Sequence, residues 1–319
     1  MPAPTVTYSP AYTLVPTYEC FNRCTYCNFR LEPGQGSWLS LAAAQRQLAR
    51  LQASGTCEIL LLSGEVHPRS PQRGAWLQRI ADLAELALAM GFLPHANVGP
   101  LQRAEMAQLK QMSVSMGLML EQLTPALLQT VHRQAPSKEP QWRLQQLAWA
   151  GELQIPFTTG VLLGIGETAA DREATLGAIA RLHRRWGHIQ EVILQPHSLG
   201  SSQAVAQEGF DLHQLPTLIA RARALLPADI AIQFPPNLVG DRQLLLDCLA
   251  AGARDLGGIG PTDEVNPNYP HHQPRSLAAL LAGAGWQLVP RLPVYPQYLD
   301  WLLPPLQAAA QRWQGAIAP

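Results

Sequence analysis

Short apolar runs alternate with longer amphipathic stretches along most of the chain. Eight of the runs have the length and composition of buried strands, and they occupy residues 12–17, 58–64, 92–98, 113–121, 156–166, 191–197, 230–236 and 253–260. The stretches between them, for example 40–55, 74–91 and 140–153, space their apolar residues as amphipathic helices do. Such alternation is typical of βαβ units and a parallel sheet. Eight units predict an α/β fold, a complete or nearly complete (βα) barrel of the TIM type.

The alternation stops near residue 262. From there the segment PTDEVNPNYPHHQPR is rich in Pro and Asn, as expected for a long loop, and a helix and a Pro-punctuated tail follow it. We therefore expect residues 1–261 to form the barrel. Residues 262–319 are expected to form a C-terminal extension that packs on it.

The charge balance narrows the class of ligand. Lys plus Arg and Asp plus Glu both count 23, and these residues are dispersed along the chain. No basic footprint for nucleic acid or an anionic membrane is present, so a small or neutral ligand is expected. The first ten residues lack the features of a secretory signal, and no run approaches about 18 uninterrupted apolar residues. These features predict a cytoplasmic protein.

Three of the five cysteines are crowded into eight residues directly after the first predicted strand. Cys20, Cys24 and Cys27 form a C-x3-C-x2-C array, and the loops after barrel strands are where barrel enzymes build their sites. Cys57 and Cys248 stand in apolar surroundings and are expected to be small buried side chains.

A closed zinc site or iron-sulfur cluster needs four protein ligands, and the array supplies three. Cys57 begins the second strand, at the opposite end of the barrel, so it is a poor fourth ligand. A cubane cluster held by three thiolates leaves one iron open to a non-protein ligand, as a catalytic site requires. A zinc site completed by a distant His and chance clustering are the alternatives.

The array, with Tyr26 beside its third cysteine, resembles the radical S-adenosylmethionine (SAM) superfamily. The resemblance implies one 4Fe-4S cluster with Cys20, Cys24 and Cys27 as ligands and an open iron that SAM chelates. A one-electron donor then reduces the cluster, and SAM is cleaved to methionine and a 5'-deoxyadenosyl radical that removes a hydrogen atom from the substrate. Tyr26 is expected beside the cofactor.

Further segments resemble the SAM-binding motifs of this superfamily. Ser63, Gly64 and Glu65 resemble its Gly-Gly-Glu segment, which binds the methionyl amino group, with Ser in place of the first Gly. Glu121 and Arg143 are expected to meet the ribose hydroxyls and the methionyl carboxylate. The segment of Gly164, Ile165 and Gly166 is expected to lie along the adenine. An ordinary strand-end turn and a solvated helix Arg are the alternatives.

Several longer segments resemble one particular family within this superfamily. The blocks SMGLMLE, HRQAPSKEPQWRL, AGELQIPFTTGVLLGIGET, GHIQEVILQPH, ARDLGGIGP and EVNP together resemble the CofG-type subunit of 7,8-didemethyl-8-hydroxy-5-deazariboflavin synthase. This resemblance implies a lyase of deazaflavin and coenzyme F420 biosynthesis. Its substrate is an adduct of a 4-hydroxybenzyl group with 5-amino-6-ribitylaminouracil, made by a companion radical SAM subunit. Ring closure releases ammonia and forms the deazaflavin.

A neutral, hydroxyl-rich substrate suits neutral polar side chains at the strand ends. The expected substrate-binding residues are His95, Asn97, Thr158, Gln195, His197, Asn237 and Asn266. Asp255 is the expected catalytic residue for proton transfer, with a turn cap as the alternative. His132, Arg133 and Lys138 are expected to border the substrate mouth or a solvated loop.

Two other functions remain open at this stage. One is a radical SAM enzyme of another pathway, such as a menaquinone or biotin-synthase-like activity. The other is a non-enzymatic iron-sulfur or zinc protein.

Overall fold

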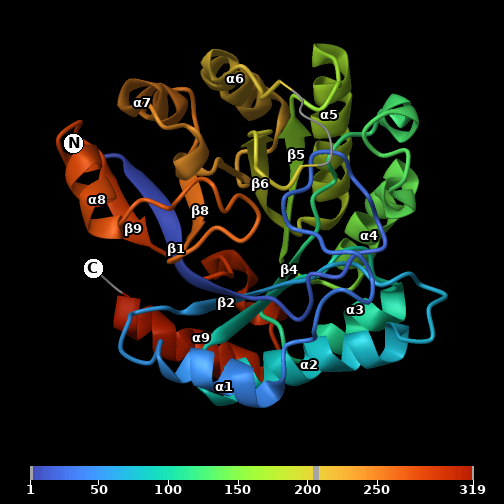
Figure 1. The fold of residues 1–319 in the computed structure, drawn as a ribbon. Helices are drawn as coiled ribbons and strands as arrows, with labels where there is room; N and C mark the ends of the chain where they lie inside the picture. The colour runs from blue at the N-terminus through green and yellow to red at the C-terminus, as the bar shows by residue number, and fades with distance from the viewer. Residues whose placement is uncertain (1–2, 204–207, 318–319) are drawn as a thin grey trace.

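Eight parallel strands close into a barrel because β1 (Thr5–Leu14) pairs with both β2 (Glu58–Leu62) and β8 (Asp255–Ile259). The structure is a computed structural model that describes residues 3–203 and 208–317 (Figure 1). The remaining strands of the barrel follow in chain order: β3 (Leu93–Asn97), β4 (Ser115–Gly117), β5 (Phe157–Leu163), β6 (Ile189–Pro196) and β7 (Ala231–Gln233). The predicted TIM-type α/β barrel is confirmed.

All eight predicted strand segments overlap a strand, but β6 begins two residues before its predicted segment and β1 begins seven residues before its apolar run. β1 starts at Thr5 rather than at residue 12. Its first half pairs with β8 and with β9 (Gln287–Pro290), whereas only Ala11–Leu14 pair with β2. The polar first half is therefore a strand because distant segments supply its hydrogen-bond partners.

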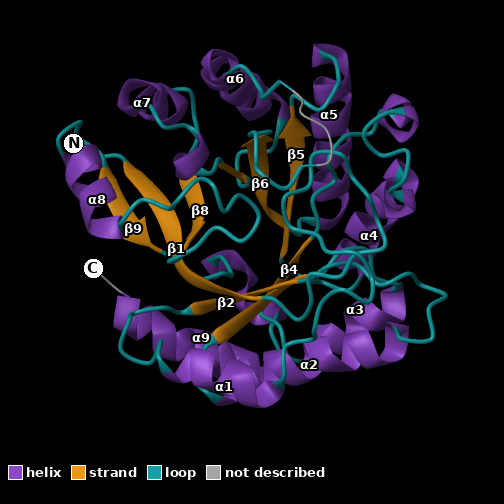
Figure 2. Cartoon of the chain, viewed as in Figure 1, coloured by secondary structure: helices purple, strands orange, loops and turns teal. Residues whose placement is uncertain are grey.

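Helices surround the strands on the outside (Figure 2). They are α1 (Leu41–Ala49), α2 (Arg73–Ala89), α3 (Arg103–Leu109), α4 (Pro140–Glu152), α5 (Ala169–Trp186), α6 (Leu215–Leu225), α7 (Arg242–Ala250) and α8 (Pro274–Ala282). In helix α5 local residues determine both ends. Thr168 caps the amino end by accepting a hydrogen bond from the Asp171 amide, and Gly187 ends the helix at φ 65°. Among the described residues, none of the helices is both long and apolar enough to cross a membrane.

The C-terminal segment closes the amino-terminal end of the barrel. After β9 come a 3-10 helix, η5 (Pro296–Trp301), and α9 (Pro304–Ile317). Buried side chains of this segment, among them Leu292 and Val294 before η5 and Tyr298 within it, form one cluster with Cys57, Leu93 and Val114 at the beginnings of β2, β3 and β4. Sites for ligands are therefore left at the carboxyl end of the barrel and in its interior. The division of the chain at residue 261 remains a prediction.

Candidate active site

The cysteine array lies in the loop after β1, on the carboxyl end of the barrel. Cys20, Cys24 and Cys27 are free thiols that line one cavity of about 250 Å³. The loop is anchored from outside, since the Phe21 amide donates to Glu65 O at 3.0 Å and the Thr25 amide donates to Val131 O at 3.2 Å. The predicted grouping of the three thiols on the active face is therefore present.

Burial raises the pKa of the Cys20 thiol to about 11 and that of Cys24 to about 12. Thiols in this environment become ligands only with a strong cation, because iron binding stabilises the thiolate. Within the described residues no three His, Cys, Asp or Glu side chains are grouped around a point that one metal ion could occupy. Three thiols that line one cavity suit a multi-iron cluster, in which each thiolate binds a different iron.

Six of the nine residues predicted to bind SAM line the same cavity. These are Tyr26, Ser63, Gly64, Glu65, Glu121 and Arg143. The other three, Gly164, Ile165 and Gly166, follow β5 and do not line it. Ile165 packs in an apolar cluster with Leu162, which does.

Glu65 is the centre of a buried network behind the cysteines. It accepts hydrogen bonds from Asn22 Nδ2 at 2.7 Å and from Ser137 Oγ, and it pairs with Arg143 Nη2 at 3.3 Å. Arg143 is only 2% exposed and also donates to Met119 O at 2.6 Å. Its cation is therefore held against the cavity and is not solvated, contrary to the ordinary alternative for a helix Arg.

Glu121 pairs with a cation that the sequence did not assign to the cofactor. Lys138 Nζ lies 2.5 Å from Glu121 Oε1, and both side chains line the cavity. Burial acts to raise the pKa of Glu121, but Lys138 and Arg143 outweigh it, so the pKa is lowered. Glu121 also has a positive φ of 64°, which is a strained conformation for a residue with a Cβ.

Lys138 was expected at the substrate mouth or on a solvated loop. It reaches the cysteine cavity because the 3-10 helix η2 (Pro136–Lys138) folds beneath the cysteine loop, where Ser137 forms hydrogen bonds with Asn22. A lysine followed by Glu-Pro at a helix start carries no sequence signal for that position.

Tyr26 is enclosed by two imidazoles. Its hydroxyl lies 2.8 Å from His132 Nε2, and its ring packs on His132 and His197 with centroid distances of 5.6 and 6.2 Å. Nearby, Glu167 accepts from the amides of Gly164 and Ile165 at 2.8 and 2.9 Å. These contacts order the wall of the cavity on the β5 and β6 side.

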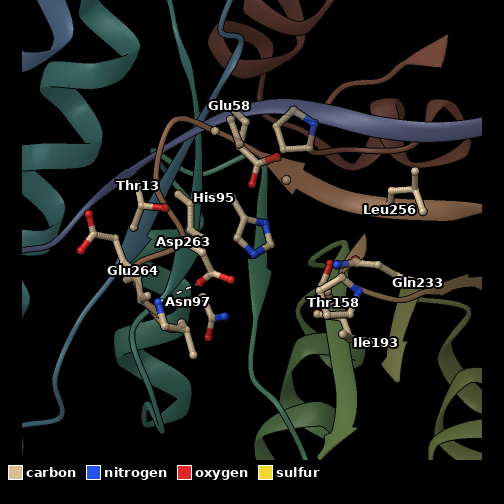
Figure 3. A pocket seen from close by; sticks show the side chains of 18 of the residues that line it. Thr13, Glu58, His95, Asn97, Thr158, Ile193, Gln233, Leu256, Asp263 and Glu264 are labelled. Carbon is tan, nitrogen blue, oxygen red and sulfur yellow. Dashed lines mark hydrogen bonds between the residues drawn. The ribbon is translucent and has the colours of Figure 1, made fainter. Parts of the chain in front are cut away.

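A second cavity of about 180 Å³ occupies the barrel interior (Figure 3). Five of the predicted substrate-binding residues line it: His95, Asn97, Thr158, Gln195 and Asn266. Three of these five, Asn97, Gln195 and Asn266, also line the cysteine cavity, as do Leu62, Ile193 and Val265. The two cavities are thus neighbours with a common wall.

Two predicted substrate-binding residues lie elsewhere. His197 lines only the cysteine cavity. Asn237 lines neither cavity, and its Nδ2 donates to Asp263 Oδ2 and to Tyr269 O, both at 2.9 Å. Asn237 therefore fixes the position of the loop after β8 through these two hydrogen bonds.

Asp255 does not occupy the position that proton transfer to a substrate would need. It is the first residue of β8, at the closed end of the barrel, and it lines neither cavity. Its fully buried carboxylate accepts from Arg291 Nε at 2.6 Å and Nη2 at 2.8 Å, and from the Gly257 amide at 2.7 Å. The geometry instead makes Asp255 an anchor for Arg291 of the C-terminal segment.

Two carboxylates that the sequence reasoning missed do line the inner cavity. Glu58 and Glu191 lie near the beginnings of β2 and β6, in the apolar runs EILLL and EVIL. Burial raises the pKa of Glu191 to about 7, although Arg291 opposes this effect. A charged residue inside an otherwise apolar strand was the available signal.

Comparison with known proteins agrees with this site. Residues 14–179 match the radical SAM superfamily. The chain is 66% identical over 311 residues to a 7,8-didemethyl-8-hydroxy-5-deazariboflavin synthase of Trichormus variabilis, covering 98% of this chain and 92% of that protein. It is 64% identical over 308 residues to the protein of the same name in Synechococcus elongatus, with 97% and 92% covered.

Solved structures share the fold. The FeFe-hydrogenase maturase HydG of Carboxydothermus hydrogenoformans superposes with a TM-score of 0.73 at 19% identity, covering 97% of this chain and 77% of that one. Methylornithine synthase (PylB) superposes with a TM-score of 0.69 at 15% identity, covering 89% and 84%. At these identities the likeness concerns the barrel alone.

Proposed function

Because the chain belongs to the radical SAM superfamily, we propose that it carries out the reaction named in its curated relatives, the synthesis of 7,8-didemethyl-8-hydroxy-5-deazariboflavin. Its substrate is the 5-amino-5-(4-hydroxybenzyl)-6-(D-ribitylimino)-5,6-dihydrouracil adduct, and ammonia is released. The observation that carries the proposal is the cavity of three thiols that adjoins a polar cavity inside the barrel.

A 4Fe-4S cluster bound by Cys20, Cys24 and Cys27 would supply the electron that cleaves SAM to the 5'-deoxyadenosyl radical. The donor set fits, because the three thiols share a cavity with the carboxylates of Glu65 and Glu121 and with the cations of Lys138 and Arg143. The cations of Arg143 and Lys138 suit the methionyl carboxylate. Glu65 suits the methionyl ammonium group, and Glu121 suits the ribose hydroxyls.

The inner cavity would hold the adduct. Its walls offer neutral amides, a hydroxyl and an imidazole beside apolar Leu62 and Ile193, as a flat and hydroxyl-rich molecule requires. A companion radical SAM subunit makes the adduct, and a one-electron donor reduces the cluster. We place the protein in the cytoplasm and assign it no nucleic acid or membrane partner.

The test is turnover of the purified adduct. Reduced, cluster-loaded protein with SAM should form 5'-deoxyadenosine, ammonia and the fluorescent deazaflavin. With tyrosine and 5-amino-6-ribitylaminouracil, and without the companion subunit, it should form none, because the carbon bridge between the rings has not been made.

Two results would contradict the proposal. If another small molecule couples to 5'-deoxyadenosine formation and the adduct does not, the enzyme belongs to another radical SAM pathway. If SAM is not cleaved under dithionite at all, the protein is a non-enzymatic iron-sulfur protein.

A further inference from the structure

The lining of the barrel interior changes in character from one end to the other. Along β2 the inward-facing residues are Glu58, Leu60 and Leu62, and along β6 they are Glu191, Ile193 and Gln195. The last residue of each series borders the cysteine cavity as well, whereas the first lines only the inner cavity. Glu58 and Glu191 therefore mark the end farther from the cysteines, while Asp263 and Glu264 of the loop after β8 line the cavity at its other end.

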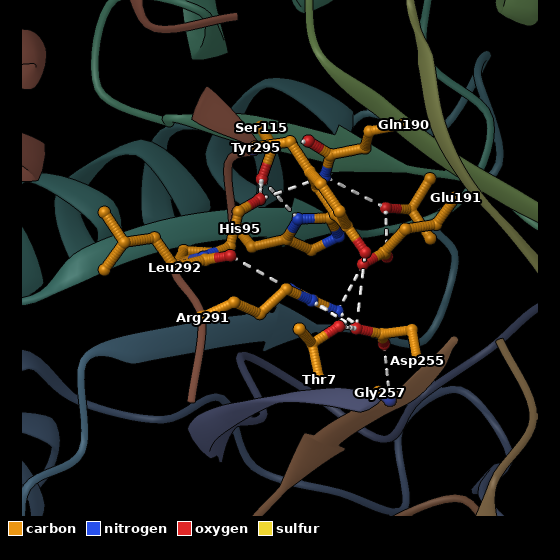
Figure 4. Close-up of polar contacts among 12 residues, drawn as sticks. Thr7, His95, Ser115, Gln190, Glu191, Asp255, Gly257, Arg291, Leu292 and Tyr295 are labelled. Atoms are coloured by element: carbon orange, nitrogen blue, oxygen red, sulfur yellow. Dashed lines mark hydrogen bonds and ion pairs between the residues drawn. The ribbon is translucent and has the colours of Figure 1, made fainter. Parts of the chain in front are cut away.

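The end at Glu58 and Glu191 has more carboxylates than cations among the residues described. Arg291 donates twice to Asp255 and also pairs with Glu191 (Figure 4). Glu191 accepts a further hydrogen bond from Thr158 Oγ1 at 2.9 Å. Burial raises the pKa of Glu58, although the field of Arg291 and the Ser9 hydroxyl oppose this effect. Glu58 faces the cavity as an acceptor whose capacity the protein does not fill.

His95 presents a second acceptor, because its tautomer is determined by its neighbours. Ser115 Oγ lies 2.6 Å from Pro293 O, which can only accept, so the Ser115 hydroxyl hydrogen points to that carbonyl. The 2.7 Å contact between Ser115 Oγ and His95 Nδ1 is then donated by the imidazole N–H. Nε2 of the neutral ring is left with a lone pair.

The charge state of His95 agrees with this assignment. Burial and then the nearby Arg291 lower the pKa of His95 to about 3, so the ring is neutral at physiological pH. Figure 3 shows the side chains of Glu58 and His95 directed into the same space, with Thr158 and Gln233 on the facing wall. The end of the inner cavity at Glu58 and Glu191 is therefore rich in hydrogen-bond acceptors.

We propose that the end of the inner cavity at Glu58 and Glu191 binds the polyhydroxylated ribityl arm of the substrate. The hydroxyls of the arm donate to His95 Nε2 and to Glu58, while the ring system lies toward the cysteines. Hydroxyl groups bring the donors that these acceptors lack, and a neutral polyol is not repelled by the carboxylates. The flat rings then lie between Leu62 and Ile193, where both cavities meet. This inference rests on the proposed function.

The test compares the ribityl adduct with an adduct that carries an ethyl group in place of the ribityl arm. Dissociation constants are measured by calorimetry on cluster-loaded protein, so the result does not depend on turnover. His95→Phe should weaken binding of the ribityl adduct at least about tenfold, the loss expected for a hydrogen bond in a closed site, and leave binding of the ethyl adduct unchanged. His95→Gln, which retains an acceptor, should recover part of the loss.

Glu58→Gln provides a second variant, and it should also discriminate between the two adducts. The exposed imidazole of His213 provides a matched control, since His213→Phe should affect neither. Equal losses for both adducts in the His95 and Glu58 variants would show that these residues only support the barrel, and the proposal would fail. If the His95 and Glu58 variants lose affinity only for the ribityl adduct, but the wild-type protein forms no deazaflavin from it, the proposed function fails. The assignment of the cavity end that binds the ribityl arm then stands.

Discussion

Gly64 shows how one missing side chain positions the cysteine loop. The Gly64 amide donates to Thr17 O at 2.7 Å, and a Cβ on Gly64 would lie 2.1 Å from Glu19 O. The backbone next to Cys20 therefore rests directly on the end of β2, which leaves no room for a methyl group.

We expect Gly64→Ala to displace the loop of Cys20, to reduce the iron content of the protein and to lower its free energy of unfolding by about 1–3 kcal/mol, as overpacking does. Iron analysis and urea unfolding measure the two effects. Gly74→Ala is the control, because Gly74 lies in α2 with no atom within 4 Å of its Cβ position. That change should stabilise the protein slightly. Full iron loading of Gly64→Ala would contradict the argument.

The cysteines divide into two groups by their surroundings. Cys20→Ala, Cys24→Ala and Cys27→Ala should each abolish the brown absorbance of the cluster, since each thiol lines the cofactor cavity. Cys57→Ala and Cys248→Ala should retain it, because both thiols are fully buried in the apolar packing. A complete four-iron cluster in any of the first three variants would show that the missing cysteine is not a ligand.

Arg133 is a matched control for Lys138, because both side chains are cations and they lie five positions apart in the sequence. Lys138 pairs with Glu121 in the cofactor cavity, whereas Arg133 is exposed. Lys138→Met should weaken SAM binding more than about tenfold without removing the cluster, because one partner of a desolvated charge pair is lost. Arg133→Met should leave SAM affinity unchanged. Equal SAM affinities for the two variants, measured by calorimetry, would remove Lys138 from the site.

At the scale of elements, β6 begins directly after a buried imidazole. His188 is fully buried beside the ring of Phe157, and burial lowers its pKa from 6.5 to about 4. The unfolded chain therefore binds a proton between pH 6.5 and 4 that the folded protein excludes. The free energy of unfolding must fall as the pH drops through this interval.

His188→Phe should reduce the fall in the free energy of unfolding as the pH drops. The full interval corresponds to about 3 kcal/mol at 1.36 kcal/mol per pKa unit. Urea unfolding at several pH values between 8 and 4 should show the wild-type stability decreasing more steeply than that of the variant. Parallel curves would mean that His188 is protonated in the folded protein.

At the scale of the whole molecule, the C-terminal segment is joined to the barrel by a buried cation. Arg291 follows β9, and its guanidinium pairs with Asp255 of β8 and Glu191 of β6. Three segments that are distant in sequence therefore meet at one charge. Pro293 extends this contact by accepting from Ser115 and Gln190.

We expect Arg291→Met to lower the free energy of unfolding by about 3–5 kcal/mol, since it leaves buried carboxylates without their cation. The exposed pair of Arg221 and Glu173 is the control, and Arg221→Met should change the free energy of unfolding little. Urea unfolding of both variants tests the contrast. Similar small losses in both would show that the C-terminal segment is held by apolar packing alone.

The sequence by itself determined what depends on short spacing. The C-x3-C-x2-C array lies within eight residues, so its thiols cannot separate in any fold, and the cavity of three thiols was predictable. The strands that sit in apolar runs were predictable for the same reason, because the periodicity of buried positions is a local property.

Only the tertiary structure decided which polar groups meet. The polar first half of β1, the pairing of Lys138 with Glu121 and the role of Asp255 as an anchor each depend on a partner from another segment. The acceptor character of His95 depends on a carbonyl at Pro293, 198 positions away. A polar side chain alone does not specify its partner, because hydrogen bonds and ion pairs are chosen by the distances that the closed barrel imposes.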